Sequence, residues 1–130
     1  MSMLSAQKLL AILFLLALSF PVCGQENIRI THTAFFRFDK TDIDIAYADN
    51  RNVLNCLGTL LSDSFHVSFI DSIHLYTYAS PEGREKYNVQ LSVRRADTMQ
   101  RYLADNYPLL SSVPVSLFPQ GENWDGLRAL

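Results

Sequence analysis

Asn88 and Arg95 are the polar side chains whose positions most strongly suggest a chemical role. They are seven residues apart, so on a helix of 3.6 residues per turn they lie two turns apart on the same side. That side is otherwise apolar and carries Leu91, Ala96, Met99, Tyr102 and Leu103. A charge on a core-facing side costs several kcal/mol unless it is paired. The pattern therefore predicts an anionic partner for Arg95.

Two interpretations of Arg95 follow from this position. The guanidinium can bind a carboxylate of a ligand, or it can pair with a carboxylate of the protein or cap loop carbonyls, as buried arginines usually do. Asn88 is expected mainly to fix the preceding turn through its side-chain amide. That turn, Ser80-Pro81-Glu82-Gly83, has typical turn composition.

The helix sequence carries a spaced pattern made of Gly83, Asn88, Leu91, Ser92, Arg95 and Ala96. This pattern resembles the OmpA C-terminal domain family, whose members are peptidoglycan-associating modules of Gram-negative envelopes. An upstream segment, with Phe36, Phe38, Asp39 and Lys40, is similar to the first strand of that family. The resemblance runs from about residue 35 to the end of the chain. It implies an α/β fold, more closely an α+β sandwich of βαβαβ order, with helices packed on a small mixed sheet.

The resemblance also implies a ligand, the diaminopimelate residue of the peptidoglycan stem peptide. A zwitterionic group of this kind needs a fixed cation for its carboxylate and a fixed anion for its ammonium group. Arg95 matches the cation, whereas the family's aspartate position is occupied by the neutral Ser80. Glu82, in the same turn, is the alternative carboxylate. The candidate ligand-binding residues are therefore Arg95, Ser80, Glu82 and Asn88.

A second hypothesis keeps the fold without wall binding. The chain is then a protein-interaction or assembly module of an outer-membrane or surface-appendage complex, with envelope proteins as partners. The neutral Ser80 favours this hypothesis, whereas Asn88 and Arg95 favour wall binding. Tyr76, Tyr78 and Tyr87 surround the turn, where they either form an aromatic wall for a ligand or pack on the sheet.

The first 24 residues have the pattern of a secretory signal peptide. The apolar run over residues 9–20 is twelve residues long, too short to span a hydrocarbon core of about 30 Å as a helix. We therefore expect cleavage after Gly24, with an OmpA-like domain from residue 25 to residue 130. Lipid attachment at Cys23 is an open alternative, although residues 20–22 lack the small residue that such processing prefers. The expected location is the periplasm or the periplasmic face of the outer membrane.

Composition excludes several classes of function. One of the eleven Lys and Arg residues, Lys8, lies in the predicted signal peptide, which leaves ten against thirteen Asp and Glu and a net charge of −3. This charge argues against nucleic acid and against a polybasic membrane patch. His32, His66 and His74 have no metal-ligand spacing, and no serine has a nucleophile-elbow pattern. We expect a non-enzymatic protein without cofactor or metal.

Periodicity predicts alternating strands and helices. Strands are expected at residues 27–38, 73–78 and 113–118. Helices are expected at residues 50–62, from the turn to near Pro108, and from residue 121 onward. The OmpA-like resemblance implies that the last of these helices is incomplete. The first strand, first helix and second strand should form a right-handed βαβ unit. Pro114 suggests an edge position for the last strand, and Cys56 is expected to pack on its helix as a small apolar residue.

Overall fold

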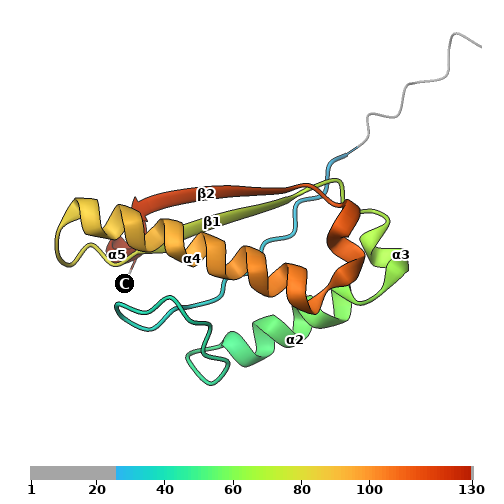
Figure 1. Ribbon diagram of the computed structural model, residues 1–130, viewed down its shortest axis with the longest axis horizontal. Helices are drawn as coiled ribbons and strands as arrows, with labels where there is room; N and C mark the ends of the chain where they lie inside the picture. The colour runs from blue at the N-terminus through green and yellow to red at the C-terminus, as the bar shows by residue number, and fades with distance from the viewer. Residues whose placement is uncertain (1–25, 130) are drawn as a thin grey trace, which may run out of the picture. The chain divides into compact units, whose positions relative to one another are not determined.

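The computed structural model describes residues 26–129 (Figure 1). The chain divides into two units between Ile30 and Thr31, and the helices and strands described here belong to the second unit. The predictions for the signal peptide, residues 1–24, and for Cys23 lie outside the described residues. Within residues 26–129, no helix combines the length and the hydropathy that crossing a membrane requires.

One strand–helix–strand unit forms the centre of the second unit. It consists of β1 (Ile73–Ala79), α4 (Glu85–Asn106) and β2 (Val115–Glu122). The strands pair in parallel, with Ile73 opposite Val115 and Tyr76 opposite Phe118. Parallel neighbours need a long crossover connection, which α4 supplies. Helices with a small two-stranded sheet make this an α+β protein, in agreement with the predicted class.

The long helix α4 forms where the sequence predicted it. Gly83, with φ of 98°, turns the chain after β1 in a conformation that favours glycine. Glu85 then lies in the first helical turn, where a negative charge complements the helix dipole. Pro108 lies two positions after Asn106, the last residue of α4, and its ring nitrogen cannot continue the hydrogen-bond ladder. The buried residues of α4 are Asn88, Leu91, Ser92, Arg95, Ala96 and Leu103, which confirms the predicted core-facing side.

Ser92 fastens α4 to both strands. Its backbone carbonyl accepts a 2.7 Å hydrogen bond from the Thr77 hydroxyl, and its own hydroxyl oxygen accepts a 3.0 Å bond from the Gly121 backbone N–H. Gly121 has φ of 71°, and a Cβ atom there would lie 3.2 Å from a methyl group of Val89. Glycine therefore allows the end of β2 to approach the helix closely.

The apolar core gathers at the opposite end of α4. Here α2 (Asn50–Leu61), α3 (Ser64–Val67) and the 3-10 helix η1 (Pro108–Ser112) meet the helix and the sheet. The buried residues of this cluster are Leu61, Val67, Leu103, Tyr107 and Leu110. The predicted apolar stripe of α2 contributes through Leu57, Leu60 and Leu61. The core therefore stabilises the far end of α4 and leaves its first turns to polar contacts.

The predicted first strand is wrong. Residues 27–38 form no strand in the structure, so the predicted βαβ unit that began there is absent, and β1, α4 and β2 form one instead. The backbone of Phe35 is bound by a side chain. Its N–H donates to Asn50 Oδ1 at 2.7 Å, and its carbonyl accepts from Asn50 Nδ2 at 2.7 Å. An amide side chain thus satisfies the two groups that a strand neighbour would bind.

The C-terminal elements are shifted from their predicted bounds. Pro114 precedes β2, which extends to Glu122, and the proline within the strand is Pro119, opposite Thr77. The last helix, α5 (Trp124–Arg128), therefore begins later than residue 121. Its start is set by Asn123, whose side-chain oxygen accepts a 2.8 Å hydrogen bond from the Gly126 N–H.

The prediction that Cys56 packs as an apolar residue is also wrong. The thiol is free and exposed. Cys56 lies two positions after the buried Leu54, which at 100° per residue turns it to the far side of α2. Helical position therefore outweighs the apolar character of the side chain.

Candidate functional site

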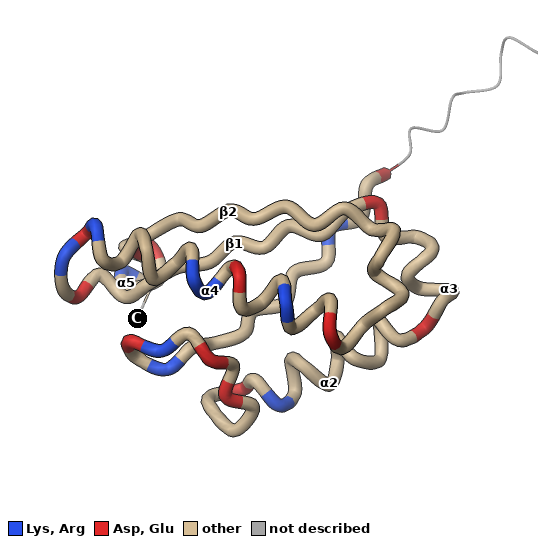
Figure 2. The backbone as a smooth tube through the Cα atoms, viewed as in Figure 1, with Lys and Arg blue, Asp and Glu red and all other residues tan. Residues whose placement is uncertain are grey.

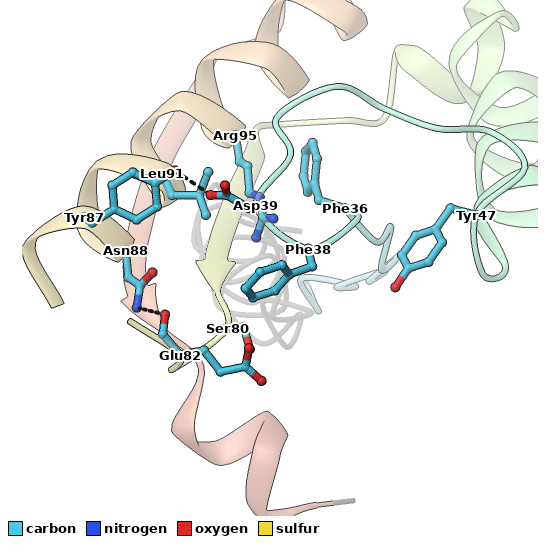
Figure 3. A pocket seen from close by; sticks show the side chains of 10 residues that line it. All are labelled: Phe36, Phe38, Asp39, Tyr47, Ser80, Glu82, Tyr87, Asn88, Leu91 and Arg95. Carbon is cyan, nitrogen blue, oxygen red and sulfur yellow. Dashed lines mark hydrogen bonds between the residues drawn. The ribbon is translucent and has the colours of Figure 1, made fainter. Parts of the chain in front are cut away.

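A cavity of about 300 Å³ lies where the first turns of α4 meet the turn after β1 and the loop before α2 (Figure 3). It is lined by Phe36, Phe38, Asp39, Tyr47, Ser80, Glu82, Tyr87, Asn88, Leu91 and Arg95. All four residues predicted for the ligand site are among them. The fold therefore brings these residues together, and it adds Asp39, which sequence analysis did not propose for the site.

Arg95 is held by backbone carbonyls. The side chain is 6% exposed, and its Nε donates to the Lys40 carbonyl at 2.9 Å. Nη1 donates to the Tyr78 carbonyl at 2.7 Å, and Nη2 to the Arg37 carbonyl at 3.0 Å. The guanidinium carbon also lies 4.9 Å from the centroid of the Phe36 ring. In direct hydrogen bonds, backbone carbonyls thus take the place of the predicted anionic partner. Two of them belong to the loop before α2, as the alternative interpretation expected, and the third belongs to β1.

Arg95 keeps donors for a further acceptor. A guanidinium has five N–H groups, and three of them are used in these bonds. Among residues 26–129, the other two have no hydrogen-bond partner. Arg95 lines the cavity, so a carboxylate that reached these two N–H groups would not have to displace the backbone carbonyls.

The turn at residues 37–40 wraps around this guanidinium. The Lys40 N–H donates to the Arg37 carbonyl at 3.0 Å, which closes the turn, and Arg95 binds the carbonyls at both of its ends. Asp39, inside the turn, has φ of 56°. This left-handed conformation is uncommon for residues other than glycine and is best tolerated by Asn and Asp. Arg95 therefore holds in place the turn that carries the Asp39 carboxylate.

Asp39 is in turn linked to α4. The Tyr87 hydroxyl donates a 2.5 Å hydrogen bond to Asp39 Oδ1. This bond raises the pKa of Tyr87, and burial and the Asp39 charge act in the same direction. The same charge reaches Arg95, whose pKa is lowered by burial and raised by the charges of Asp39 and Tyr87. A fixed cation and a fixed carboxylate therefore face one cavity.

Asn88 has the structural role that was predicted for it. Its Nδ2 donates to the Glu82 carbonyl at 3.1 Å and to Glu122 Oε1 at 2.9 Å. The other oxygen of Glu122 accepts a 2.9 Å bond from the indole N–H of Trp124. Asn88 thus joins the turn after β1 to the end of β2, and both protons of its amide are used.

The loop that carries Asp39 is anchored from α2 by Asn50, a residue that sequence analysis missed. Asn50 is fully buried and makes three hydrogen bonds, two to Phe35 and a third to the Asp44 carbonyl at 2.8 Å. Its position at the start of an amphipathic helix is equally typical of a solvent-exposed residue. Only the path of the folded loop shows that this asparagine is buried and not exposed to solvent.

Comparisons of the chain with protein-family models, with curated proteins and with solved structures find no match. A function for the cavity therefore has to follow from its own residues.

The ion pair of Arg37 and Asp44 predicts a loss of stability in acid. Arg37 Nε lies 2.6 Å from Asp44 Oδ2, and this hydrogen bond, with the Ala46 N–H, lowers the pKa of Asp44 below its ordinary value of 3.8. A carboxyl group with a lowered pKa stabilises the fold above its unfolded pKa and ceases to do so as the pH falls through its folded pKa. We expect wild type to melt above the Asp44→Asn variant at about pH 6, with the difference closing below about pH 4. Thermal melts followed by circular dichroism would measure it, and an unchanged difference at about pH 3 would contradict the assignment.

Proposed function

We propose that the protein is an exported, non-enzymatic envelope protein that associates non-covalently with peptidoglycan through the cavity at Arg95. The ligand is the diaminopimelate residue of the stem peptide, whose side chain ends in an ammonium group and a carboxylate on one carbon. The observation that carries the proposal is the meeting of Arg95, Ser80, Glu82 and Asn88 around one cavity, beside the two unused donors of Arg95.

The chemistry of the cavity agrees with this ligand. The guanidinium of Arg95 is planar and always charged, and it binds carboxylates well even when buried. Phe36 and Phe38 line the cavity with apolar surface, which suits the methylene chain of diaminopimelate. The predicted net charge of the mature chain is negative, so the association depends on the local site and not on overall attraction.

Co-sedimentation with purified sacculi tests the proposal. We expect the purified protein to pellet with intact sacculi and to stay in solution with sacculi whose stem peptides have been removed by an amidase. A soluble, diaminopimelate-containing stem peptide should release it from intact sacculi. The comparison isolates the peptide, because both preparations keep the same glycan strands.

Two results would contradict wall binding through the stem peptide. One is a protein that stays in solution with intact sacculi while its circular dichroism shows a folded state. The other is equal sedimentation with both preparations, which would assign the binding to the glycan. An Asp71→Asn variant is the control for sedimentation caused by general charge, because Asp71 is exposed and is not part of the cavity lining.

A protein-interaction or assembly module is the second candidate, and one observation favours it. Tyr76 and Phe118 stack on the sheet with ring centroids 4.9 Å apart and planes at 14°, and His74 meets Phe118 edge-on at 5.3 Å. Tyr76 remains 52% exposed. Aromatic residues are enriched at protein interfaces, so this exposed ring pair fits a surface that contacts another protein. The test is chemical cross-linking of the protein to other proteins in cell envelopes. Cross-links that are lost in a Tyr76→Ser variant, from a protein that does not bind sacculi, would support this function.

A further inference from the structure

We infer that Asp39 supplies the carboxylate that binds the ligand's ammonium group. It takes the part that an acidic residue at the position of Ser80 would have. The inference rests on the proposed function, because it concerns the same cavity and the same ligand. It assigns the anionic half of the site to the loop before α2, which lies far in sequence from the turn after β1.

The first support is the way Asp39 is presented. The turn at residues 37–40 places Asp39 in a left-handed backbone conformation with φ of 56°. Such a conformation persists only where the surrounding structure enforces it, and it often marks a ligand-binding position. Here Arg95 enforces it through the carbonyls of Arg37 and Lys40. The cation of the site therefore positions the loop that carries the anion.

The second support is the free oxygen of Asp39. Oδ1 accepts the Tyr87 hydroxyl, and within residues 26–129 Oδ2 has no hydrogen-bond partner. One oxygen therefore orients the carboxylate while the other is left for a ligand. In Figure 3 the Asp39 carboxylate is drawn next to the guanidinium of Arg95, and its charge acts on Arg95. An ammonium group and a carboxylate on one carbon atom need two such charges in close proximity.

The other acidic side chains near the turn fit less well. The Glu82 carboxylate is drawn in Figure 3 on the Ser80 side of the cavity, away from Arg95, and it is not among the charges that act on Arg95. Glu122 is held by Asn88 and Trp124, with a bond to each oxygen. Ser80 is neutral. Asp39 is thus the carboxylate best placed to share one zwitterionic group with Arg95.

A chemical double-mutant cycle tests the assignment. The ligands are a diaminopimelate-containing stem peptide and the same peptide with its side-chain ammonium group acetylated. The proteins are wild type and Asp39→Asn. We expect Asp39→Asn to bind the unmodified peptide about tenfold to a hundredfold more weakly. The acetylated peptide should bind both proteins equally, because it has no ammonium group for Asp39 to contact. Isothermal titration calorimetry measures all four affinities.

The variants are chosen to leave the fold unchanged. Asparagine tolerates the left-handed conformation of residue 39, and its side-chain oxygen can still accept the Tyr87 hydroxyl. Asp71→Asn serves as the matched control outside the cavity, and Glu82→Gln tests the competing carboxylate that lines it. All three remove one negative charge, so overall charge cannot explain a difference between them.

Each outcome of these titrations either supports or overturns the inference. Loss of affinity for the unmodified peptide alone in Asp39→Asn, with Asp71→Asn unchanged, supports the inference. Loss in Glu82→Gln with no change in Asp39→Asn overturns it and leaves the proposed function standing. Equal loss for both peptides in Asp39→Asn also overturns it, because the effect would then not involve the ammonium group. If wild type binds neither the peptide nor sacculi, the proposed function and the inference both fail.

Discussion

Replacement of Arg95 by alanine is expected to lower the free energy of unfolding by about 3–5 kcal/mol, since the change removes three hydrogen bonds made by a largely buried charged side chain. The carbonyls of Lys40 and Tyr78 lose the bond from Arg95, and so does the Arg37 carbonyl, which keeps only the bond from the Lys40 N–H. Small domains are stable by about 5–15 kcal/mol, so the variant loses a large part of its stability. Urea denaturation followed by circular dichroism would measure the loss.

Two further variants identify the cause of that loss. Arg95→Lys keeps the charge but not the fork of donors, and we expect it to recover about half of the lost stability or less. Arg101→Ala removes an exposed arginine from the same helix and should change stability by no more than about 0.5 kcal/mol. Equal stability of Arg95→Ala and Arg101→Ala would show that the carbonyl bonds do not stabilise the fold. Because Arg95→Ala also destabilises the fold, a loss of wall binding in this variant would not by itself show that Arg95 contacts the ligand.

The second large effect is expected for Asn50→Asp, at about 2–4 kcal/mol of destabilisation near neutral pH. Aspartate has nearly the same shape, but it puts a charged oxygen where Asn50 Nδ2 now donates to the carbonyls of Phe35 and Asp44. The site is fully buried, so water cannot replace the lost donors. Urea denaturation at two pH values would measure the effect, which should shrink in acid as the new carboxyl group gains a proton.

Asn55→Asp is the matched control for this prediction. It makes the same chemical change on the same helix at an exposed position, and we expect a change of about 0.5 kcal/mol or less. A similar small effect at Asn50 would mean that the loop before α2 is not anchored by the amide.

Sequence patterns predicted the regular parts of the fold well, because those parts depend on periodic burial. The apolar spacing of α2 and α4 and the alternation in β1 each report which side of an element is buried, and the structure has all three elements. The burial of Asn88 and Arg95 followed from the same spacing. Their presence at one cavity with Ser80 and Glu82 followed from their closeness in sequence.

Patterns failed where backbone groups decide the structure. The alternation of residues 27–38 predicts a strand, but a strand also needs an edge to pair with, and Asn50 binds Phe35 instead. Any residue can offer a carbonyl, so no pattern could show that Arg95 would bind three of them. The presence of Asp39 at the cavity was equally hidden, because it depends on a left-handed turn that only the folded loop creates.

The bonds of Arg95 also determine when the cavity can form during folding. Two of them join residues 55 and 58 positions apart in the chain, whereas α4 and its two strands lie within one continuous stretch, Ile73 to Glu122. Contacts between residues distant in sequence carry a larger entropic cost of loop closure and tend to form after local ones. We therefore expect the β1–α4–β2 unit to form first, with the guanidinium bonded within the unit only to the Tyr78 carbonyl, and the loop of Asp39 to dock onto it afterwards. The cavity is then completed in the last step of folding.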